Sequence, residues 1–263
     1  MFKQRLLWVV VRILYHPLDR IRLLYLLARA TPSSVVPASR RLSASLTFWG
    51  AYQLIVRREG FAGLYRGLLL VAARQILADV LQHYSRQLFR RRMEWIRSLL
   101  VDIILHPFDV VVGKVWGDIS DGSSRSDSGT LQLLLLGGAP AVVRRVFQTS
   151  GVAGFFVGLL PHLSAQVTYR NLAFFFVSMA PRHSTGRLWV PLFLSQIATF
   201  IGHPMDAGRR MMVQYPEYFE STQHWLITSY AERGISAWWA GYTLMLLRVV
   251  LATYSQRALA AIL

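Results

Sequence analysis

Three aspartates are the residues whose type and spacing point most directly to chemistry in this chain. Asp19, Asp109 and Asp206 each end the same pattern, His-Pro-x-Asp, and its prolines recur at intervals of 90 and 97 residues. A proline inside an apolar helix removes a backbone hydrogen bond and kinks the helix. A carboxylate between apolar runs is costly at membrane depth unless it has a partner. The repeat therefore predicts three equivalent ionic sites within one fold.

Arginines at helical spacing supply partners for these carboxylates. Arg22 follows Asp19 by three residues and Arg209 follows Asp206 by three, so each pair shares one helix face. Arg12 lies seven residues, or two turns, before Asp19 and belongs to the same face. Guanidinium groups that converge on a wet interior suit the bidentate binding of phosphate. The pattern favours binding of a multiply charged anion.

A second signature follows each proline. Its frame is a glycine, four residues, an aromatic residue, one further residue and a second glycine, and it occupies 60–67, 151–158 and 234–241. Arg74 and Arg248 each lie seven residues after the second glycine of their copy. The corresponding place in the middle copy is Ala165, followed by Gln166 and, a turn later, by Tyr169 and Arg170.

These motifs, in three copies that run in register through the whole chain, resemble the mitochondrial carrier family. That family carries Pro-x-Asp/Glu-x-x-Lys/Arg and then Asp/Glu-Gly-x4-aromatic-Lys/Arg-Gly in each repeat. The resemblance implies an all-α membrane protein of the mitochondrial inner membrane. It would have six transmembrane helices in three pseudo-threefold repeats, with three short helices on the matrix side. The expected repeats are residues 1–94, 95–182 and 183–263.

Composition agrees with a membrane protein. The chain is 54% hydrophobic with a mean hydropathy of +0.36. The uncharged runs 146–169 and 188–205 are long enough to span, yet Gly or Pro interrupts both, so a hydropathy scan should miscount the helices. We expect long helices at about 2–29, 68–89, 95–116, 159–179, 188–215 and 242–262. Short helices are expected at about 46–57, 140–149 and 218–232.

Charge and residue usage narrow the classes of function. The formal net charge is +16, almost all of it from arginine, which favours contact with anionic lipid. The arginines are dispersed among apolar segments, which argues against a nucleic-acid partner. The absence of cysteine excludes disulfides and cysteine-ligated metals. The histidines lack metal spacing, and no phosphate-loop or nucleophile motif is present, so we predict neither a cofactor nor an enzyme.

The resemblance implies a matrix gate, a ring of ion pairs between the odd-numbered membrane helices. Each acid would meet the base of the next odd helix, which pairs Asp109 with Arg209 and Asp206 with Arg22. Asp19 would face Val112, which cannot pair. The alternative is that the three aspartates are held by local hydrogen bonds. The predicted matrix-gate residues are Asp19, Arg22, Asp109, Asp206 and Arg209.

The resemblance also implies a substrate level near the membrane midplane, where this sequence is similar to the ADP/ATP carriers. The predicted substrate-binding residues are Arg12, Arg74, Gln166, Tyr169, Arg170 and Arg248. We expect Arg12, Arg74 and Arg248 to point, without counter-ions, into one water-filled space with Tyr169 on its wall. Such a site would hold a phosphate-bearing or nucleotide anion of charge near −3. The alternative is structural pairing of Arg170 with Asp79 and of Arg12 with Asp102.

A lipid role follows from the resemblance as well, because backbone N–H groups at helix N-termini bind anions. In the family these sites hold cardiolipin phosphates. The candidate cardiolipin-binding residues are Gly60, Arg66, Gly67, Gly151, Gly158, Gly234 and Gly241. Only the first copy keeps its basic residue, Arg66. The alternative for all three copies is tight helix packing alone.

Departures from the family pattern leave two functions open. The acids expected at the cytosolic ends of the even helices are replaced by Gln87, Ser178 and Ala261. The glutamines that brace the matrix gate are replaced by Leu26, Trp116 and Val213. One function is a transporter that moves a small anionic metabolite by alternating access, in antiport. The other is a non-transporting carrier fold that serves as a structural or assembly subunit of a mitochondrial membrane complex.

Overall fold

The computed structural model describes residues 2–43, 45–88, 94–119, 136, 138–179 and 189–262, and every regular element within these ranges is a helix. The long helices are α1 (Phe2–Ala30), α3 (Leu68–Leu88), α4 (Glu94–Gly117), α7 (Leu159–Met179), α8 (Trp189–Gln214) and α10 (Tyr242–Ile262). The shorter ones are α2 (Phe48–Glu59), α6 (Ala139–Ser150) and α9 (Thr222–Arg233). Four 3-10 helices complete the set: η1 (Ala38–Arg40), η2 (Phe61–Tyr65), η5 (Val152–Phe156) and η6 (Ile235–Trp239).

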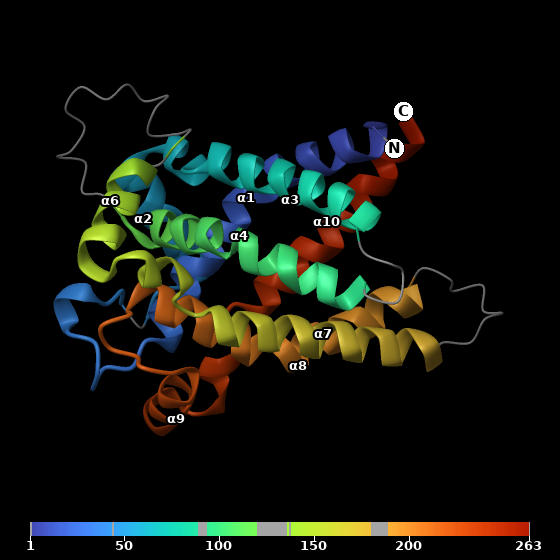
Figure 1. Cartoon of the computed structure of the whole chain (residues 1–263). Helices are drawn as coiled ribbons and strands as arrows, with labels where there is room; N and C mark the ends of the chain where they lie inside the picture. Colours follow the sequence, from blue (N-terminus) through green and yellow to red (C-terminus); the bar gives the residue numbers. More distant parts are fainter. Residues whose placement is uncertain are drawn as a thin grey trace.

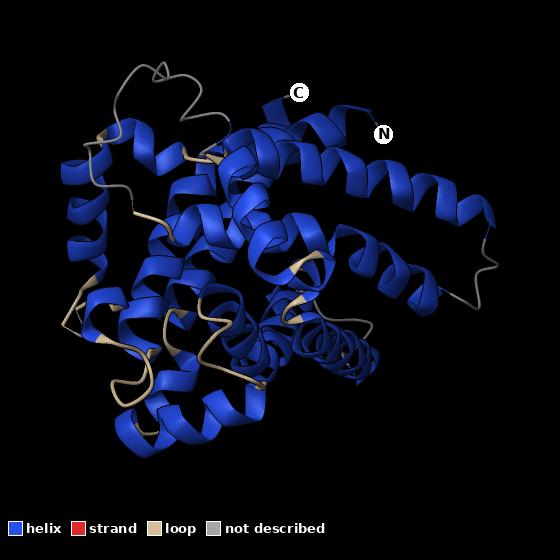
Figure 2. Ribbon diagram, turned by 60° about the vertical axis from the view of Figure 1, so that its left-hand side comes forward, coloured by secondary structure: helices blue, strands red, loops and turns tan. Residues whose placement is uncertain are grey.

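The long helices form one bundle (Figures 1 and 2). Each long helix contacts the next one along the chain, in the order α1, α3, α4, α7, α8 and α10. Helix α10 in turn contacts α1, so the ring of helices is closed. Both chain ends lie at one end of the bundle, and α2, α6 and α9 lie at the other (Figure 1). The short helices thus cover one end of the bundle, and the proline of α1, α4 and α8 falls in the interior of each helix.

The main hydrophobic core lies at the end that carries the short helices. Trp225 of α9 and Ile55 of α2 are fully buried there against Leu24 of α1 and Met211 of α8. Burying such side chains stabilises a fold by roughly 1.5–3 kcal/mol each. The much smaller second cluster, at Ala78, Val101 and Leu105, joins α3 to α4. Packing is thus concentrated around the matrix-gate positions, and it fixes the helices that carry them.

Two short helices begin later than the sequence pattern predicts. Thr47 accepts a hydrogen bond from the Gly50 N–H at 3.0 Å, and Ser221 accepts one from the His224 N–H at 3.1 Å. A hydroxyl in this position satisfies a backbone donor that has no partner inside the helix. α2 and α9 therefore start immediately after these residues, which corrects the predicted starts at 46 and 218.

The three histidines before the prolines tie the long helices to the 3-10 turns. His16 Nδ1 lies 3.2 Å from the Leu64 carbonyl oxygen, and His203 Nδ1 lies 3.0 Å from that of Trp238. His106 reaches the Val157 carbonyl through Nε2 at 3.0 Å. A carbonyl only accepts, so each imidazole donates. Each histidine thus links its long helix, α1, α4 or α8, to the turn just before the following long helix, α3, α7 or α10.

Hydropathy alone identifies few spans. Among the described residues, only the segment Ile235–Ser255 has both the length and the hydropathy to cross a membrane. A second span would be counted if Ala139–Ser150 and Val152–Leu172, which meet at 114°, were taken as one.

Glu232 fastens α9 to the turn after α1. Its carboxylate accepts hydrogen bonds from the Ser33 backbone N–H, from the Ser33 hydroxyl at 2.6 Å and from the Ser34 N–H at 2.6 Å. Burial opposes ionisation, but these hydrogen bonds outweigh it and lower the pKa of Glu232 to about 2. A carboxyl whose pKa is lower in the folded state stabilises the fold above its unfolded pKa.

We therefore expect Glu232→Gln to lower the melting temperature near neutral pH and to lose that effect in acid. The difference from the wild type should be constant above about pH 6 and should shrink as the pH falls from about 4.5 toward 2. Melting curves of both proteins between pH 3 and 7 measure it. A difference that stays the same at every pH would contradict the hydrogen-bonded carboxylate.

Candidate functional site

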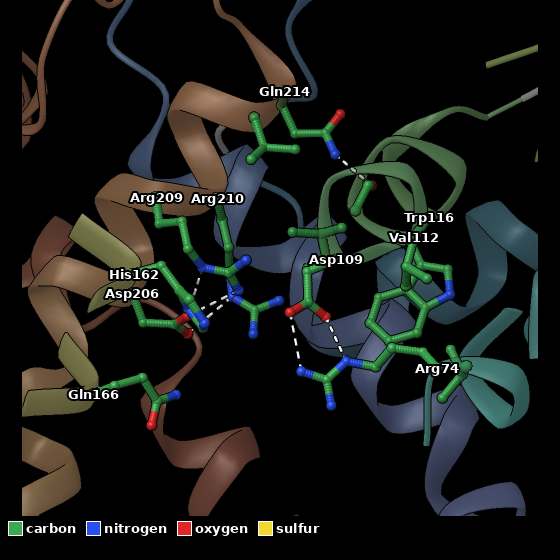
Figure 3. A pocket seen from close by; sticks show the side chains of 14 residues that line it. Arg74, Asp109, Val112, Trp116, His162, Gln166, Asp206, Arg209, Arg210 and Gln214 are labelled. Atoms are coloured by element: carbon green, nitrogen blue, oxygen red, sulfur yellow. Dashed lines mark hydrogen bonds and ion pairs between the residues drawn. The ribbon is translucent and has the colours of Figure 1, made fainter. Parts of the chain in front are cut away.

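A cavity of about 250 Å³ opens in the middle of the bundle, close to the matrix-gate positions (Figure 3). Its walls come from α1, α3, α4, α7 and α8. The polar and charged lining residues are Arg74, Asp109, His162, Gln166, Asp206, Arg209, Arg210 and Gln214. This brings residues from all three predicted repeats to one place, as a shared binding site requires.

Asp206 is the centre of the charge on one wall. Arg209 Nη2 lies 3.1 Å from its Oδ1, and Arg210 Nε lies 2.9 Å from its Oδ2. Both come from the next turn of the same helix, and Figure 3 shows them side by side on the cavity wall. Arg22 of α1 adds a third contact, Nη2 to Oδ2 at 3.4 Å. Three guanidinium groups share one carboxylate, so two positive charges remain in excess.

The predicted ion pair between Arg22 and Asp206 is present. Arg22 is buried and also donates from Nη2 to His203 Nε2 at 3.2 Å. That contact agrees with the hydrogen bond of His203 to the Trp238 carbonyl, because a neutral imidazole donates from one nitrogen and accepts at the other. A chain of polar contacts thus links α1, α8 and η6 at this corner of the gate.

The other gate pairing differs from the prediction. Asp109 does not pair with Arg209 but holds Arg74 of α3 in a bidentate contact, at 2.9 and 3.0 Å. Asp19, expected to face only Val112, lies 3.1 Å from Arg248 Nε of α10. In both cases the base comes from the neighbouring long helix without a His-Pro-x-Asp motif, α3 for Asp109 and α10 for Asp19, rather than from the next helix that carries the motif. Arg74 points from α3 toward α4, and Arg248 points from α10 toward α1, instead of into open space.

These contacts correct the predicted cavity. Arg74 and Arg248 have counter-ions, so they are not the uncompensated charges that the sequence pattern predicts. The third equivalent position is Ala165, which has no charge, and Asp206 is held by α1 and α8 arginines instead. The excess charge of the site therefore collects around Asp206 alone.

Of the remaining predicted substrate-binding residues, some line the cavity and others do not. Gln166 lines the cavity. Arg170 donates from Nη2 to Asp102 Oδ2 at 2.6 Å, so its partner is Asp102 and not the Asp79 of the alternative. Tyr169 is 37% exposed and is not part of the cavity wall. The side chain of Arg12 lies outside the described residues.

Two glycines let the gate arginines approach the neighbouring helices. Gly158 and Gly241 have φ of 76° and 78°, a region that side chains with a Cβ rarely adopt. A Cβ at Gly158 would lie 3.1 Å from Arg209 Cγ, and one at Gly241 would lie 3.3 Å from Arg22 Cγ. In two of the three copies, the second glycine of the repeated signature therefore leaves room for the stem of an arginine predicted to belong to the matrix gate.

Arg66 has a different environment from the one a lipid ligand needs. Its side chain is buried, and Nη1 lies 2.8 Å from Glu59 Oε1 and 3.0 Å from the Asp118 carbonyl oxygen. Arg20 of α1 holds the same Glu59 carboxylate, at 2.6 and 3.0 Å. Arg66 is thus part of an internal ionic cluster, which corrects its assignment to a lipid phosphate.

Sequence reasoning missed several residues of the site. His162 and Arg210 line the cavity, and Gln214 donates to the Gly113 carbonyl of α4. Gln214 braces two gate helices one position beyond Val213, where a bracing glutamine was found to be missing. The signal for Arg210 was its spacing of four from Asp206, next to the three of Arg209. Among the described residues, no three His, Asp or Glu side chains gather in a way that would hold a metal ion.

Residues 9–97 match the model of the family described as mitochondrial carrier protein. The matched segment contains most of α1, all of α2 and α3 and the first residues of α4. It includes Asp19, Arg22, Glu59 and Arg74, and it overlaps most of the first predicted repeat. Over this first third of its length the chain is similar to mitochondrial carrier proteins, which supports the resemblance carried by the three repeated motifs.

Proposed function

We propose that this protein is a carrier-type transporter of the mitochondrial inner membrane that moves a small dianion through the cavity beside Asp206. The observation that carries the proposal is the excess of guanidinium groups on that wall. Arg22, Arg209 and Arg210 share a single carboxylate, at 3.4, 3.1 and 2.9 Å. Two uncompensated positive charges next to a cavity favour a ligand of charge −2.

Size and charge together favour a phosphate-bearing metabolite bound through its phosphate group. A phosphomonoester carries roughly −1.5 to −2 charges near neutral pH. The cavity of about 250 Å³ is smaller than the roughly 300–1,000 Å³ typical of sites for drug-sized ligands. Pairing of Arg74 with Asp109 and of Arg248 with Asp19 removes the charges that a ligand of charge −3 would need.

Exposed apolar side chains support a membrane location. Ile76, Ile104, Leu160, Phe193 and Leu247, from five of the long helices, are all exposed. A monomeric soluble protein rarely leaves so many large apolar side chains on its outside. Lipid tails would cover them, with the charged residues turned to the bundle interior. Six membrane helices in three repeats remain part of this proposal.

The proposal includes a lipid site at the glycine turns, at which backbone N–H groups, and not Arg66, would bind the lipid. Phe61, Val152 and Ile235 follow the first glycine of each signature and are exposed by 68%, 64% and 56%. Apolar side chains at three corresponding places suit the boundary between lipid tails and headgroups. The N–H groups at the start of the following long helices would then face lipid phosphate, cardiolipin included.

Removal of one arginine beside Asp206 is expected to weaken anion binding by about tenfold to a hundredfold, the effect of one charge-assisted hydrogen bond. The test uses the full chain in liposomes loaded with phosphate, and it measures exchange of labelled phosphate, glycerol phosphate and an adenine nucleotide. Arg209→Gln and Arg210→Gln should lose exchange. Arg57→Gln, on the exposed side of α2, should retain it.

A non-transporting function is the second candidate, and specific contacts favour it. Two of the three predicted gate acids are joined to α3 and α10 by Arg74 and Arg248. These ion pairs would hold the bundle in one state. Gln87 stands where an opposite gate would need an acid. If no phosphate-bearing anion is exchanged and none raises the melting temperature, the chain is better explained as a structural or assembly subunit of a membrane complex.

A further inference from the structure

Two buried histidines next to the cavity have ring nitrogens without hydrogen-bond partners in the described part of the chain. His162 of α7 is 6% exposed and lines the cavity, and its Nε2 is buried without a partner (Figure 3). His106 of α4 is fully buried, and its Nδ1 is also buried without a hydrogen-bond partner. The two ring centroids lie 5.4 Å apart. Buried polar atoms without partners are rare and call for an explanation.

The hydrogen bond on the far side of His106 fixes which of its nitrogens carries hydrogen. His106 Nε2 lies 3.0 Å from the Val157 carbonyl oxygen, and a carbonyl only accepts, so Nε2 bears the hydrogen. In the neutral ring Nδ1 is then a bare acceptor. The unpartnered Nε2 of His162, on the ring whose centroid lies 5.4 Å away, can satisfy it directly, after a small shift, only as an N–H donor.

The same reasoning fixes which ring nitrogen of His162 is directed to the cavity and whether that nitrogen carries hydrogen. With hydrogen on Nε2, the Nδ1 of neutral His162 is a lone-pair acceptor, and it is the ring nitrogen left for the cavity. An acceptor repels an anion, whereas a protonated imidazole donates a charge-assisted hydrogen bond from both nitrogens. A cavity with surplus arginines therefore meets its ligand with one group of the wrong polarity until that group is protonated.

We propose that the cavity binds its dianion together with one proton, which His162 takes up on Nδ1. This rests on the proposed function, since it concerns the same cavity. The groups that face His162 are His106 and Asp109 from α4, and Asp206 and Arg209 from α8. Both carboxylates are already held by arginines, so the arriving dianion, rather than a neighbouring acid, supplies the negative charge that retains the proton.

The consequence is thermodynamic linkage between anion and proton. If the free protein has neutral His162 and the complex has the imidazolium, binding takes up close to one proton per anion above neutral pH. Affinity should then fall about tenfold for each pH unit over the range in which the free ring is neutral and the bound ring is protonated. In a transporter, the same linkage makes a pH difference across the membrane a driving force for the anion.

Calorimetry with sulfate measures the proton directly, because sulfate is a dianion that does not itself titrate near neutral pH. Binding to the full chain in detergent is recorded at pH 7.5 in several buffers with different enthalpies of ionisation. The slope of observed enthalpy against buffer enthalpy gives the number of protons taken up. We expect about one for the wild type and close to zero for His162→Gln, which keeps a polar side chain without a titrating group.

His224→Gln, an exposed histidine of α9, is the matched control and should take up the same number of protons as the wild type. Wild-type sulfate binding without proton uptake would overturn this inference and leave the proposed function intact. Uptake that persists in His162→Gln would place the proton elsewhere and also overturn it. Should sulfate, phosphate and glycerol phosphate all fail to bind, the proposed function fails. The wild-type slope alone decides the matter if the variant does not fold.

Discussion

Glu59→Gln is expected to lower the free energy of unfolding by about 3–5 kcal/mol, the usual effect of removing one partner from a buried ionic cluster. The carboxylate of Glu59 holds Arg20 through both oxygens, at 2.6 and 3.0 Å, and Arg66 at 2.8 Å. The side chains of Arg20 and Glu59 are 0% and 1% exposed. Glutamine has nearly the same shape and creates no cavity, so the loss comes from the missing charge and from the acceptor oxygen that an NH2 group replaces.

The position of this cluster explains why its loss should be felt by the whole fold. Arg20 also donates to the Gly63 carbonyl and, at 3.3 Å, to that of Asp118. One guanidinium thus joins α1 to α2, η2 and the end of α4. Without the carboxylate, Arg20 keeps these carbonyls but has lost its counter-ion in a site without water access.

Denaturant titration in detergent, followed by tryptophan fluorescence, measures the change. Glu220→Gln, at an exposed carboxylate, should stay within about 0.5 kcal/mol of the wild type. Arg20→Met combined with Glu59→Gln should recover part of the loss, because the buried charge is then gone as well. A Glu59→Gln protein as stable as the wild type would show that the cluster is solvated or that its charges contribute little.

Asp206→Asn is expected to have the second large effect, with a loss of about 3 kcal/mol and a melting temperature lower by about 6–12 °C. Three arginines lose their shared counter-ion, and the contact between α1 and α8 through Arg22 is broken. Asp109→Asn releases only Arg74, which water in the cavity can solvate. The melting temperatures should therefore fall in the order wild type, Asp109→Asn, Asp206→Asn.

Added sulfate distinguishes this explanation from a general weakening of the fold. The site of Asp206→Asn has one more uncompensated positive charge than the wild type, so sulfate should bind it more tightly and raise its melting temperature further. Asp109→Asn should gain less, since Arg74 lies across the cavity from Arg209 and Arg210 (Figure 3). Equal responses of all three proteins to sulfate would mean that the arginines around Asp206 do not form an anion site.

Much of the fold was predictable from the sequence because its signals are local. The six long helices follow from the apolar runs around the repeated motifs and from the resemblance to a known family, and their observed bounds differ from the predicted ones by only a few residues. The glycines at 67, 158 and 241 have φ between 76° and 78°, as a repeated turn signature requires. The starts of α2 and α9 were wrong, since a capping hydroxyl outweighed the apolar pattern that preceded it. The three-repeat domain boundaries remain a prediction.

The sequence by itself determined which face and which level of the bundle each charged residue occupies. The repeated motif gave Asp19, Asp109 and Asp206 equivalent positions, and the resemblance to the mitochondrial carrier family implied the pair of Arg22 with Asp206, which is present at 3.4 Å. Both results depend on the repeat and on which helices are neighbours in a carrier-like bundle.

Only the tertiary structure decided how the arginines are divided among the acids. An arginine has several rotatable bonds, so a register that fixes its backbone leaves its guanidinium free to reach any of two or three neighbouring helices. Arg74 and Arg248 therefore reached the nearest carboxylate instead of open space, and Arg66 turned inward to Glu59. The unpartnered nitrogens of His106 and His162 likewise arise only where α4 and α7 pack together, because a buried group lacks a partner only in relation to everything around it.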